Sequence, residues 1–139
     1  MALNRNTQLL QALQTGNPMT QPWHEQALAL LRDHREWVRL EWRDPQLGML
    51  VGVDTPYRTG PFARLGRGNA QSDVQLACAN ARRLSGPAYS TSYFVPQLDG
   101  LGLEVMELCL PLVSAGQLTG YVVATYSLGE ILAGLAGRS

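Results

Sequence analysis

The sequence predicts an α+β fold in which helices flank a five-stranded antiparallel sheet. The first observation is a change of hydrophobic period, because apolar residues recur at helical spacing up to residue 34 and alternate from residue 37. The second is that strand-like runs follow one another across short turns, which favours antiparallel pairing. The third is a helical segment between the first two runs and the last three, which we expect to join the other helices on one face of the sheet.

Length and charge limit the possible classes of protein. The 139 residues suit a single domain over 1–139, with a core over about 21–136 and a helical segment over 1–17. Eleven basic residues balance eleven acidic ones, which argues against a nucleic-acid binder and against a polybasic membrane-surface segment. The sequence contains no run of about 18 apolar residues and no secretory signal pattern. We therefore expect a globular domain with no transmembrane helix of its own.

Two helices are expected before the sheet. The first runs from Asn6 to Gln14 and ends at residues 16–18, where Gly, Asn and Pro break it. Thr20 is placed to cap the second, and Pro22 is tolerated in its first turn. The apolar side of this second helix is formed at helical spacing by Trp23, Ala27, Leu30, Leu31 and His34.

A hairpin is expected next. Its first strand has Val38, Leu40 and Trp42 on one face and Trp37, Arg39 and Glu41 on the other. The turn chemistry comes from Asp44, Pro45 and Gly48. In the second strand the residues expected on one face are Leu47, Met49, Val51 and Val53.

The remaining elements follow a crossover segment over residues 54–68, which reads as a loop with a short helical turn near Phe62–Leu65. Asn69 or Ser72 caps a third helix, which ends at Gly86. Three strands are then expected over Ala88–Gln97, Leu101–Val113 and Leu118–Tyr126, and Ser127 caps a closing helix that begins at Leu128.

Three segments resemble PAS-like sensor domains. The hairpin EWVRLEWRDPQLGMLVGVD is similar to the opening strands of PAS domains. The ending LPLVSAGQLTGYVVATYSLGEIL resembles the close of extracytoplasmic PAS-like sensors, the single-Cache group of bacterial sensor histidine kinases. There a Pro-containing strand, a short turn and a Gly-led apolar strand lead into the helix that runs to the membrane. The segment GPAYSTSYFVP is similar to the third strand of such sensors, and the resemblance covers roughly residues 21 to 136.

The resemblance implies a function and a location. It implies the ligand-sensing input domain of a two-component sensor histidine kinase, in the periplasmic part of an inner-membrane protein. A small metabolite would favour one packing of the sheet against its helices, and the change would pass through the Ser127–Leu135 helix to the membrane. The alternative is a cytoplasmic PAS module that serves only in dimerisation and holds no ligand. The chain has no H-box and no nucleotide-binding glycines, so any kinase part lies elsewhere in the parent protein.

No motif for catalysis, a metal or a cofactor is found, so we expect a sensor domain that is not an enzyme and has no cofactors. The serines lack a G-x-S-x-G elbow, and His24 and His34 lack the i, i+4 spacing of a metal pair. Glu104 and Glu107 lie three apart on a strand and point to opposite faces, so they form no carboxylate pair. The GRGN segment at residues 66–69 lacks a full glycine fingerprint and is interpreted as a loop with a helix cap.

Cys78 and Cys109 are far apart in sequence and form no C-x-x-C motif, which disfavours a zinc site. Two buried thiols on apolar faces is the favoured interpretation. A disulfide between the two residues is the alternative.

A ligand site is expected where PAS-like sensors have theirs, between the sheet and the crossover segment. Family sensors for organic acids use Arg or His from this region, and the planar guanidinium of Arg binds a carboxylate bidentately. We therefore expect a small carboxylate or an amino acid as ligand. The paired Arg-x-x-His of citrate sensors is absent, which disfavours citrate-like specificity. The candidate ligand-binding residues are Tyr57, Arg58, Arg64, Arg67, Tyr93, Tyr121 and Thr125.

Strand alternation groups the candidates without deciding which face is inward. One expected face carries Ser90, Ser92 and Phe94, and the other carries Tyr89, Thr91, Tyr93 and Val95. On the last strand one set is Tyr121, Val123 and Thr125, and the opposite set is Val122, Ala124 and Tyr126.

A homodimer is expected through the first helix. Leu9, Leu10 and Leu13 would leave an apolar stripe exposed on a lone domain, and such stripes mark contacts. The alternative is that this stripe packs on the domain's own sheet.

Overall fold

One antiparallel sheet organises the chain. The computed structural model describes residues 2–15, 20–67 and 72–136. Across the sheet the strand order is β2-β1-β6-β5-β3, and β4 also pairs with β5. The strands are β1 (Trp37–Arg43), β2 (Met49–Asp54), β3 (Ala88–Tyr89), β4 (Tyr93–Pro96), β5 (Gly102–Ser114) and β6 (Gln117–Ser127). The α+β fold class and the antiparallel sheet predicted from the sequence are confirmed.

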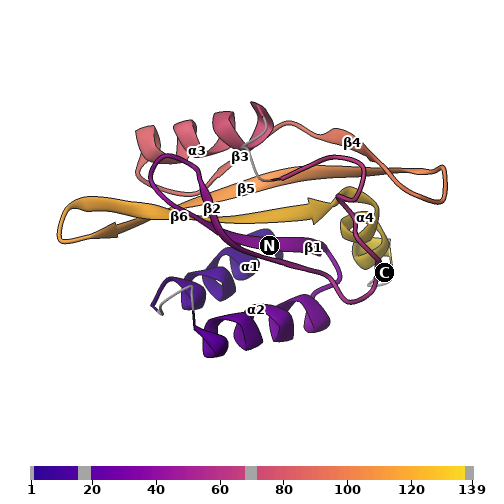
Figure 1. Cartoon of the computed structure of the whole chain (residues 1–139), viewed down its shortest axis with the longest axis horizontal. Coiled ribbons are helices and arrows are strands. Elements are labelled where there is room, and N and C mark those ends of the chain that lie inside the picture. Colours follow the sequence, from indigo (N-terminus) through magenta and orange to yellow (C-terminus); the bar gives the residue numbers. More distant parts are fainter. Residues whose placement is uncertain (1, 16–19, 68–71, 137–139) are drawn as a thin grey trace.

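Helices cover both faces of the sheet (Figure 1). The helices are α1 (Ala2–Gln11), the 3-10 helix η1 (Ala12–Thr15), α2 (Gln21–Asp33), α3 (Ser72–Leu84) and α4 (Leu128–Ala136). α1 and α2 lie on one face and α3 lies on the other, so the expectation of helices on one face is wrong. The reason is that β6 is buried without interruption from Gly120 to Ser127, and a strand buried on both sides needs cover on both.

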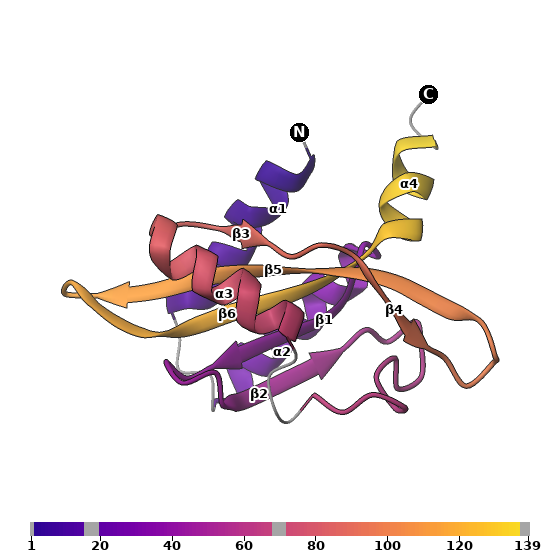
Figure 2. The same cartoon turned by 90° about the horizontal axis from the view of Figure 1, so that it is seen from above.

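α1 and α4 both extend past the same edge of the sheet (Figure 2). Ser127 Oγ accepts a hydrogen bond from the Glu130 backbone N–H at 3.3 Å, which confirms Ser127 as the cap of α4. None of the described helices is long and apolar enough to span a membrane.

The expected third strand is broken into two pieces. β3 and β4 are separated at residues 90–92, so six strands pair where five were expected. Ser90 still holds β5, because its N–H donates to the Glu107 carbonyl at 2.8 Å and its Oγ accepts from the Glu107 N–H at 2.9 Å. The break changes the phase of the alternation. The Tyr89 ring therefore lies 6.3 Å from that of Tyr126, on the α1–α2 face, whereas Tyr93 lies on the α3 face with Glu107.

Two register shifts also change the predicted faces of the hairpin. The pairing of β1 with β6 shifts between Trp37 and Arg39, so Trp37 joins the α1–α2 core and Val38 packs on the opposite face. The pairing of β1 with β2 shifts after Trp42. Met49 therefore lies beside Arg39, at 3.0 Å from its Nη2, while Val51 and Val53 pack in the core on the other face.

The first helix packs on the domain's own sheet. Leu10 and Leu13 are fully buried in the core shared with α2, and Leu9 packs against it. The apolar stripe that motivated a homodimer is therefore not exposed, and that reasoning is wrong. The helix also begins earlier than expected, at Ala2, and continues as η1 from Ala12. The expected breaker residues 16–18 and the candidate cap Asn69 lie outside the described residues.

A disulfide joins α3 to the centre of the sheet. Cys78 and Cys109 are bonded across a Cα–Cα distance of 5.2 Å, and this corrects the favoured interpretation of two free thiols. Both residues are buried between α3 and β5, on apolar faces as expected. Residues 31 positions apart are thereby fixed together.

Candidate ligand-binding sites

Charged side chains are buried where the sheet meets the crossover segment. We call this the buried charge cluster, and its members are Glu41, Arg43, Arg67, Tyr93, Glu107 and Thr125, with Arg39 and Asp54 at its edge. β1, the crossover segment, β4, β5 and β6 each supply at least one member. Strand alternation turns these side chains toward the α3 face, while their neighbours in sequence fill the core beneath α1 and α2.

Arg67 is the centre of the cluster, and all five of its N–H donors have protein acceptors. Nε donates to Glu41 at 2.9 Å. Nη1 donates to Glu107 Oε2 at 3.2 Å and to the Tyr93 hydroxyl at 3.3 Å. Nη2 donates to Glu107 Oε1 and to Thr125 Oγ1, both at 3.3 Å. Burial alone would lower the pKa of Arg67, but Glu107 and Glu41 raise it, so the side chain is a fixed cation.

Glu41 accepts from three arginines although it is completely buried. Arg39 Nε lies 2.5 Å from Oε2, Arg43 Nε lies 2.8 Å from Oε1, and Arg67 is the third donor. Burial alone would raise the pKa of Glu41, but the three guanidinium charges together outweigh burial and lower the pKa below its ordinary value. The carboxylate is therefore ionised in the folded protein.

Glu107 is held by hydroxyl groups as well as by Arg67. Thr125 Oγ1 donates to Oε1 at 2.7 Å, and the Tyr93 hydroxyl donates to Oε2. Burial and the adjacent Glu107 charge raise the pKa of Tyr93 above its ordinary value, so its phenol stays protonated and remains a donor. An arginine fork with two hydroxyl donors is also the donor set that suits a ligand carboxylate, and here a side chain of the protein occupies it.

The charges in and around the cluster balance. Three guanidinium groups face three carboxylates: Arg39, Arg43 and Arg67 against Asp54, Glu41 and Glu107. Arg43 also donates to the Leu47 carbonyl at 2.7 Å and to the Arg67 carbonyl at 2.9 Å. An anion entering the cluster would therefore have to displace a carboxylate of the protein.

The predicted site residues divide into separate groups. Arg67, Tyr93 and Thr125 come together in the buried charge cluster. Arg58 lies elsewhere and donates to Gln97 Oε1 at 3.3 Å, while Arg64 is exposed.

Tyr57 lies apart from the cluster, at the surface near α2. Its hydroxyl donates to the Arg32 carbonyl at 2.7 Å, and the Arg35 guanidinium lies 3.9 Å from its ring centre. Near them a small polar pocket of about 90 Å³ opens beside the start of α4, lined in part by Arg58, Ser127 and Glu130.

Sequence reasoning missed the carboxylates of the cluster. It correctly separated Glu104 from Glu107, since Glu104 accepts instead from Ser92 Oγ at 2.9 Å. It did not anticipate that Glu107 and Glu41 would be buried with arginines. One signal was present, because Arg39, Glu41 and Arg43 alternate with apolar residues along β1 and so place three charges on one face.

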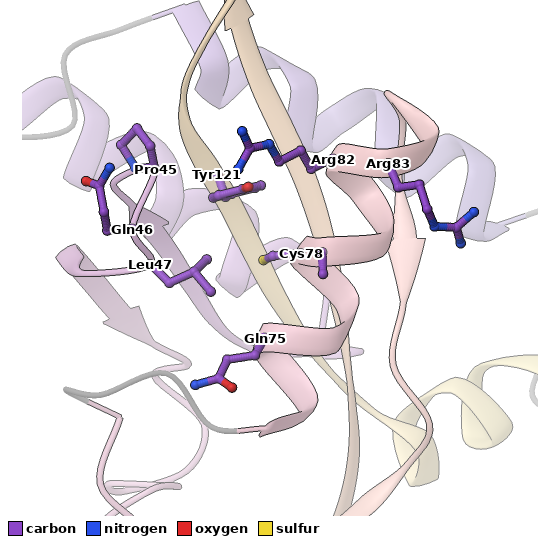
Figure 3. Close-up of a pocket in the computed structure, with 9 residues that line it drawn as sticks. Pro45, Gln46, Leu47, Gln75, Cys78, Arg82, Arg83 and Tyr121 are labelled. Carbon is purple, nitrogen blue, oxygen red and sulfur yellow. The ribbon is translucent and has the colours of Figure 1, made fainter.

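A larger, open pocket lies between the β1–β2 turn and α3 (Figure 3). We call it the turn–α3 pocket, and its volume is about 530 Å³. Its lining residues are Pro45, Gln46, Leu47, Gln75, Cys78, Ala79, Arg82, Arg83 and Tyr121. Tyr121 is the one predicted site residue that lies here, which separates it from Thr125 on the same face of β6.

No arrangement for metal binding is found, since the described residues contain no cluster of three or more His, Cys, Asp or Glu side chains that could hold an ion. His34 instead lies 3.2 Å from Glu36 and packs beside Trp37.

Comparisons with known proteins give structural likeness without sequence likeness. No protein-family model matches the chain, and no curated protein resembles it in sequence. The ligand-binding domain of the Pseudomonas aeruginosa PAO1 amino acid chemoreceptor PctC, in complex with GABA, superposes with a TM-score of 0.60 at 15% identity, over 94% of this chain and 55% of that one.

A second similar structure is a domain of a sensory box/GGDEF family protein from Vibrio parahaemolyticus. It gives a TM-score of 0.62 at 12% identity, over 90% of this chain and 54% of that one. The chain thus spans about half the length of each of these two structures. The identities are low, so the likeness concerns the fold. The chain shares the α+β fold of these two domains, in keeping with the fold class that its sequence predicted.

Proposed function

We propose that this chain is the ligand-sensing input domain of a bacterial membrane-anchored signalling protein, a sensor histidine kinase, and that it lies in the periplasm. The fold supports a sensor, and the disulfide supports an oxidising compartment. One observation carries the proposal. The buried charge cluster ties the crossover segment to β6, and β6 leads without a break into α4.

The geometry suggests how a signal would travel. Arg67 in the crossover donates to Thr125, and a single residue separates Thr125 from Ser127, the cap of α4. A ligand that favours one position of the crossover would shift this contact and hence the start of α4. α4 can move in response to such a shift, because Leu132 and Leu135 are exposed and few residues of α4 pack on the sheet.

The proposed ligand is a small carboxylate or an amino acid. The PctC domain holds GABA, an amino acid, in its complex. In this chain Arg58 and Arg64 stand at the crossover surface with no acidic partner among the described residues, which leaves both guanidinium groups able to meet a carboxylate.

One observation favours the alternative, a PAS-type dimerisation module without ligand. The buried charge cluster is balanced, and every donor of Arg67 is used within the protein. The space between the sheet and the crossover segment, where the sequence led us to expect a ligand, is thereby filled by side chains of the protein. Under this alternative the domain would act through a homodimer, and no metabolite would change its stability.

A thermal-shift screen of small carboxylates and amino acids, GABA included, distinguishes the ligand sensor from the dimerisation module. The sensor proposal expects at least one compound to raise the melting temperature and to change amide hydrogen exchange over 128–136 in α4. A compound matched in size but uncharged serves as control. If no compound shifts the melting temperature while sedimentation shows a dimer, the dimerisation module is correct and the sensor proposal is wrong.

A further inference from the structure

The turn–α3 pocket has the composition of an anion site. No acidic residue lines it, and Arg82 is the arginine of its lining that points toward Tyr121 (Figure 3). Its volume of about 530 Å³ lies within the range of small-molecule sites. Leu47, Ala79 and the ring of Tyr121 give it apolar surface. Charge and shape together suit a molecule with an apolar body and one negative group.

The Tyr121 hydroxyl strengthens this assignment. Most of the Tyr121 side chain is buried, but its hydroxyl is accessible at the pocket and makes no hydrogen bond to another described residue. A tyrosine hydroxyl both donates and accepts hydrogen bonds, so an accessible one can donate to a carboxylate. A hydroxyl that lines a pocket and lacks a partner in the protein is placed to meet one from a ligand.

The side chains of Arg82 and Arg83 point in different directions although the two residues are neighbours in sequence. Figure 3 shows Arg82 reaching from α3 toward Tyr121, whereas Arg83 points away from it. Arg83 donates to Asn80 at 3.2 Å, while Arg82 has no acidic partner among the described residues. Arg82 is therefore the guanidinium placed to bind an anion beside Tyr121, and Arg83 is a matched control.

We propose that the turn–α3 pocket binds an organic monocarboxylate with an apolar body, whose carboxylate is held by Arg82 and the Tyr121 hydroxyl. The apolar body rests on Leu47 and Ala79. This inference deepens the proposed sensory function by assigning a site and a ligand class, and it places the ligand outside the buried charge cluster.

The pocket is connected to the cluster through the β1–β2 turn. Leu47 has a positive φ of 70°, a backbone conformation that non-glycine residues rarely adopt. Its carbonyl accepts from Arg43 Nη1 at 2.7 Å, and Arg43 also binds Glu41. A ligand that presses on Leu47 would therefore act on the cluster through a single guanidinium.

Phenylacetate and hexanoate serve as probes, with phenylacetamide and hexanamide as uncharged controls. Titration of isotope-labelled protein followed by amide NMR would move signals at residues 45–47, 75–83 and 121, at concentrations up to about 10 mM. Arg82→Gln should weaken binding about tenfold or more, and Tyr121→Phe by a few-fold. Arg83→Gln should bind like the wild type. The thermal unfolding curve of each variant confirms that it is folded.

The outcomes separate this inference from the proposed function. No signal change with either carboxylate, equal binding of the amides, or changes confined to the Arg58 and Arg64 region would each overturn the pocket assignment. In the last case the sensory function would still stand. If the probes bind in the pocket and Arg82→Gln abolishes this, the site is established. Unchanged hydrogen exchange in α4 would then count against the sensory function alone.

Discussion

Arg67 and Glu107, 40 residues apart in sequence, are joined by two hydrogen bonds of 3.2 and 3.3 Å in the interior of the domain. Their side chains are 3% and 0% exposed. Both charges are buried, so each depends on partners in the protein, and Arg67 is the arginine that pairs with Glu107. The pair ties the crossover segment to the central strand β5.

Breaking this pair should be costly. Arg67→Met or Glu107→Gln alone leaves a buried group without its main partner and should lower the free energy of unfolding by about 3–5 kcal/mol. The double variant should lose less than the sum of the two, because it removes the charge and its partner together. Urea denaturation of the four proteins measures this. Arg64→Met, at an exposed position, should change stability by less than about 0.5 kcal/mol, and additive losses at the pair would contradict the prediction.

Tyr93 should remain protonated in alkali. Because its pKa is raised in the folded protein, Tyr93 contributes stability that is present below the ordinary value of 10.0 and lost as pH rises toward the folded pKa. Ultraviolet difference absorbance at about pH 11 should therefore be the same for the folded wild type and folded Tyr93→Phe. In urea the variant should lose one fifth of the tyrosinate signal, since the chain has five tyrosines. A loss of that size in the folded variant would disprove the assignment.

Glu41 should give the domain an acid-sensitive stability. Its pKa is lowered on folding, so its contribution is present above the ordinary value of 4.5 and is lost as pH falls through the folded pKa. Denaturation curves from about pH 7 to about pH 3 should therefore fall more steeply for the wild type than for Glu41→Gln. Glu104→Gln, at a partly exposed position, is the matched control. Parallel curves for wild type and Glu41→Gln would show that Glu41 is not ionised by its arginines.

The disulfide should contribute to stability by restricting the unfolded chain. Loss of a crosslink over 31 positions is expected to cost about 3–4 kcal/mol. The Cys78→Ala/Cys109→Ala variant should melt at a lower temperature than the oxidised wild type. A reducing agent should lower the melting temperature of the wild type toward that of the variant and leave the variant unchanged. An equal effect on both proteins would show that the reductant acts elsewhere.

Local patterns predicted the order of the elements and much of their orientation. The change of period at Trp37, the turn at Asp44 and the cap at Ser127 all depend on neighbours in sequence, and each is found where expected. On β6, where the register with β1 is regular over this stretch, alternation placed Tyr121 and Thr125 on one face and Tyr126 on the other. Period-two reasoning holds as long as pairing stays in register.

Alternation failed where the tertiary structure interrupts the register. The shift beside Trp37 exchanged the faces of Trp37 and Val38, and the break at residues 90–92 separated Tyr89 from Tyr93. Each interruption moves one residue out of the ladder and reverses every face beyond it. Sequence alone gives no position for such shifts, since they adjust strands to the layers packed against them.

The sequence by itself determined an α+β domain with a paired antiparallel sheet, a closing helix and a polar crossover rich in arginine. Only the tertiary structure decided which charges are buried together, that Cys78 meets Cys109, and that Tyr121 lines the turn–α3 pocket while Thr125 lies in the buried charge cluster. The physical reason is that a buried charge or thiol takes its partner from whatever lies across from it in space. For Arg67 those partners stand 26 and 40 residues away, beyond the reach of any local pattern.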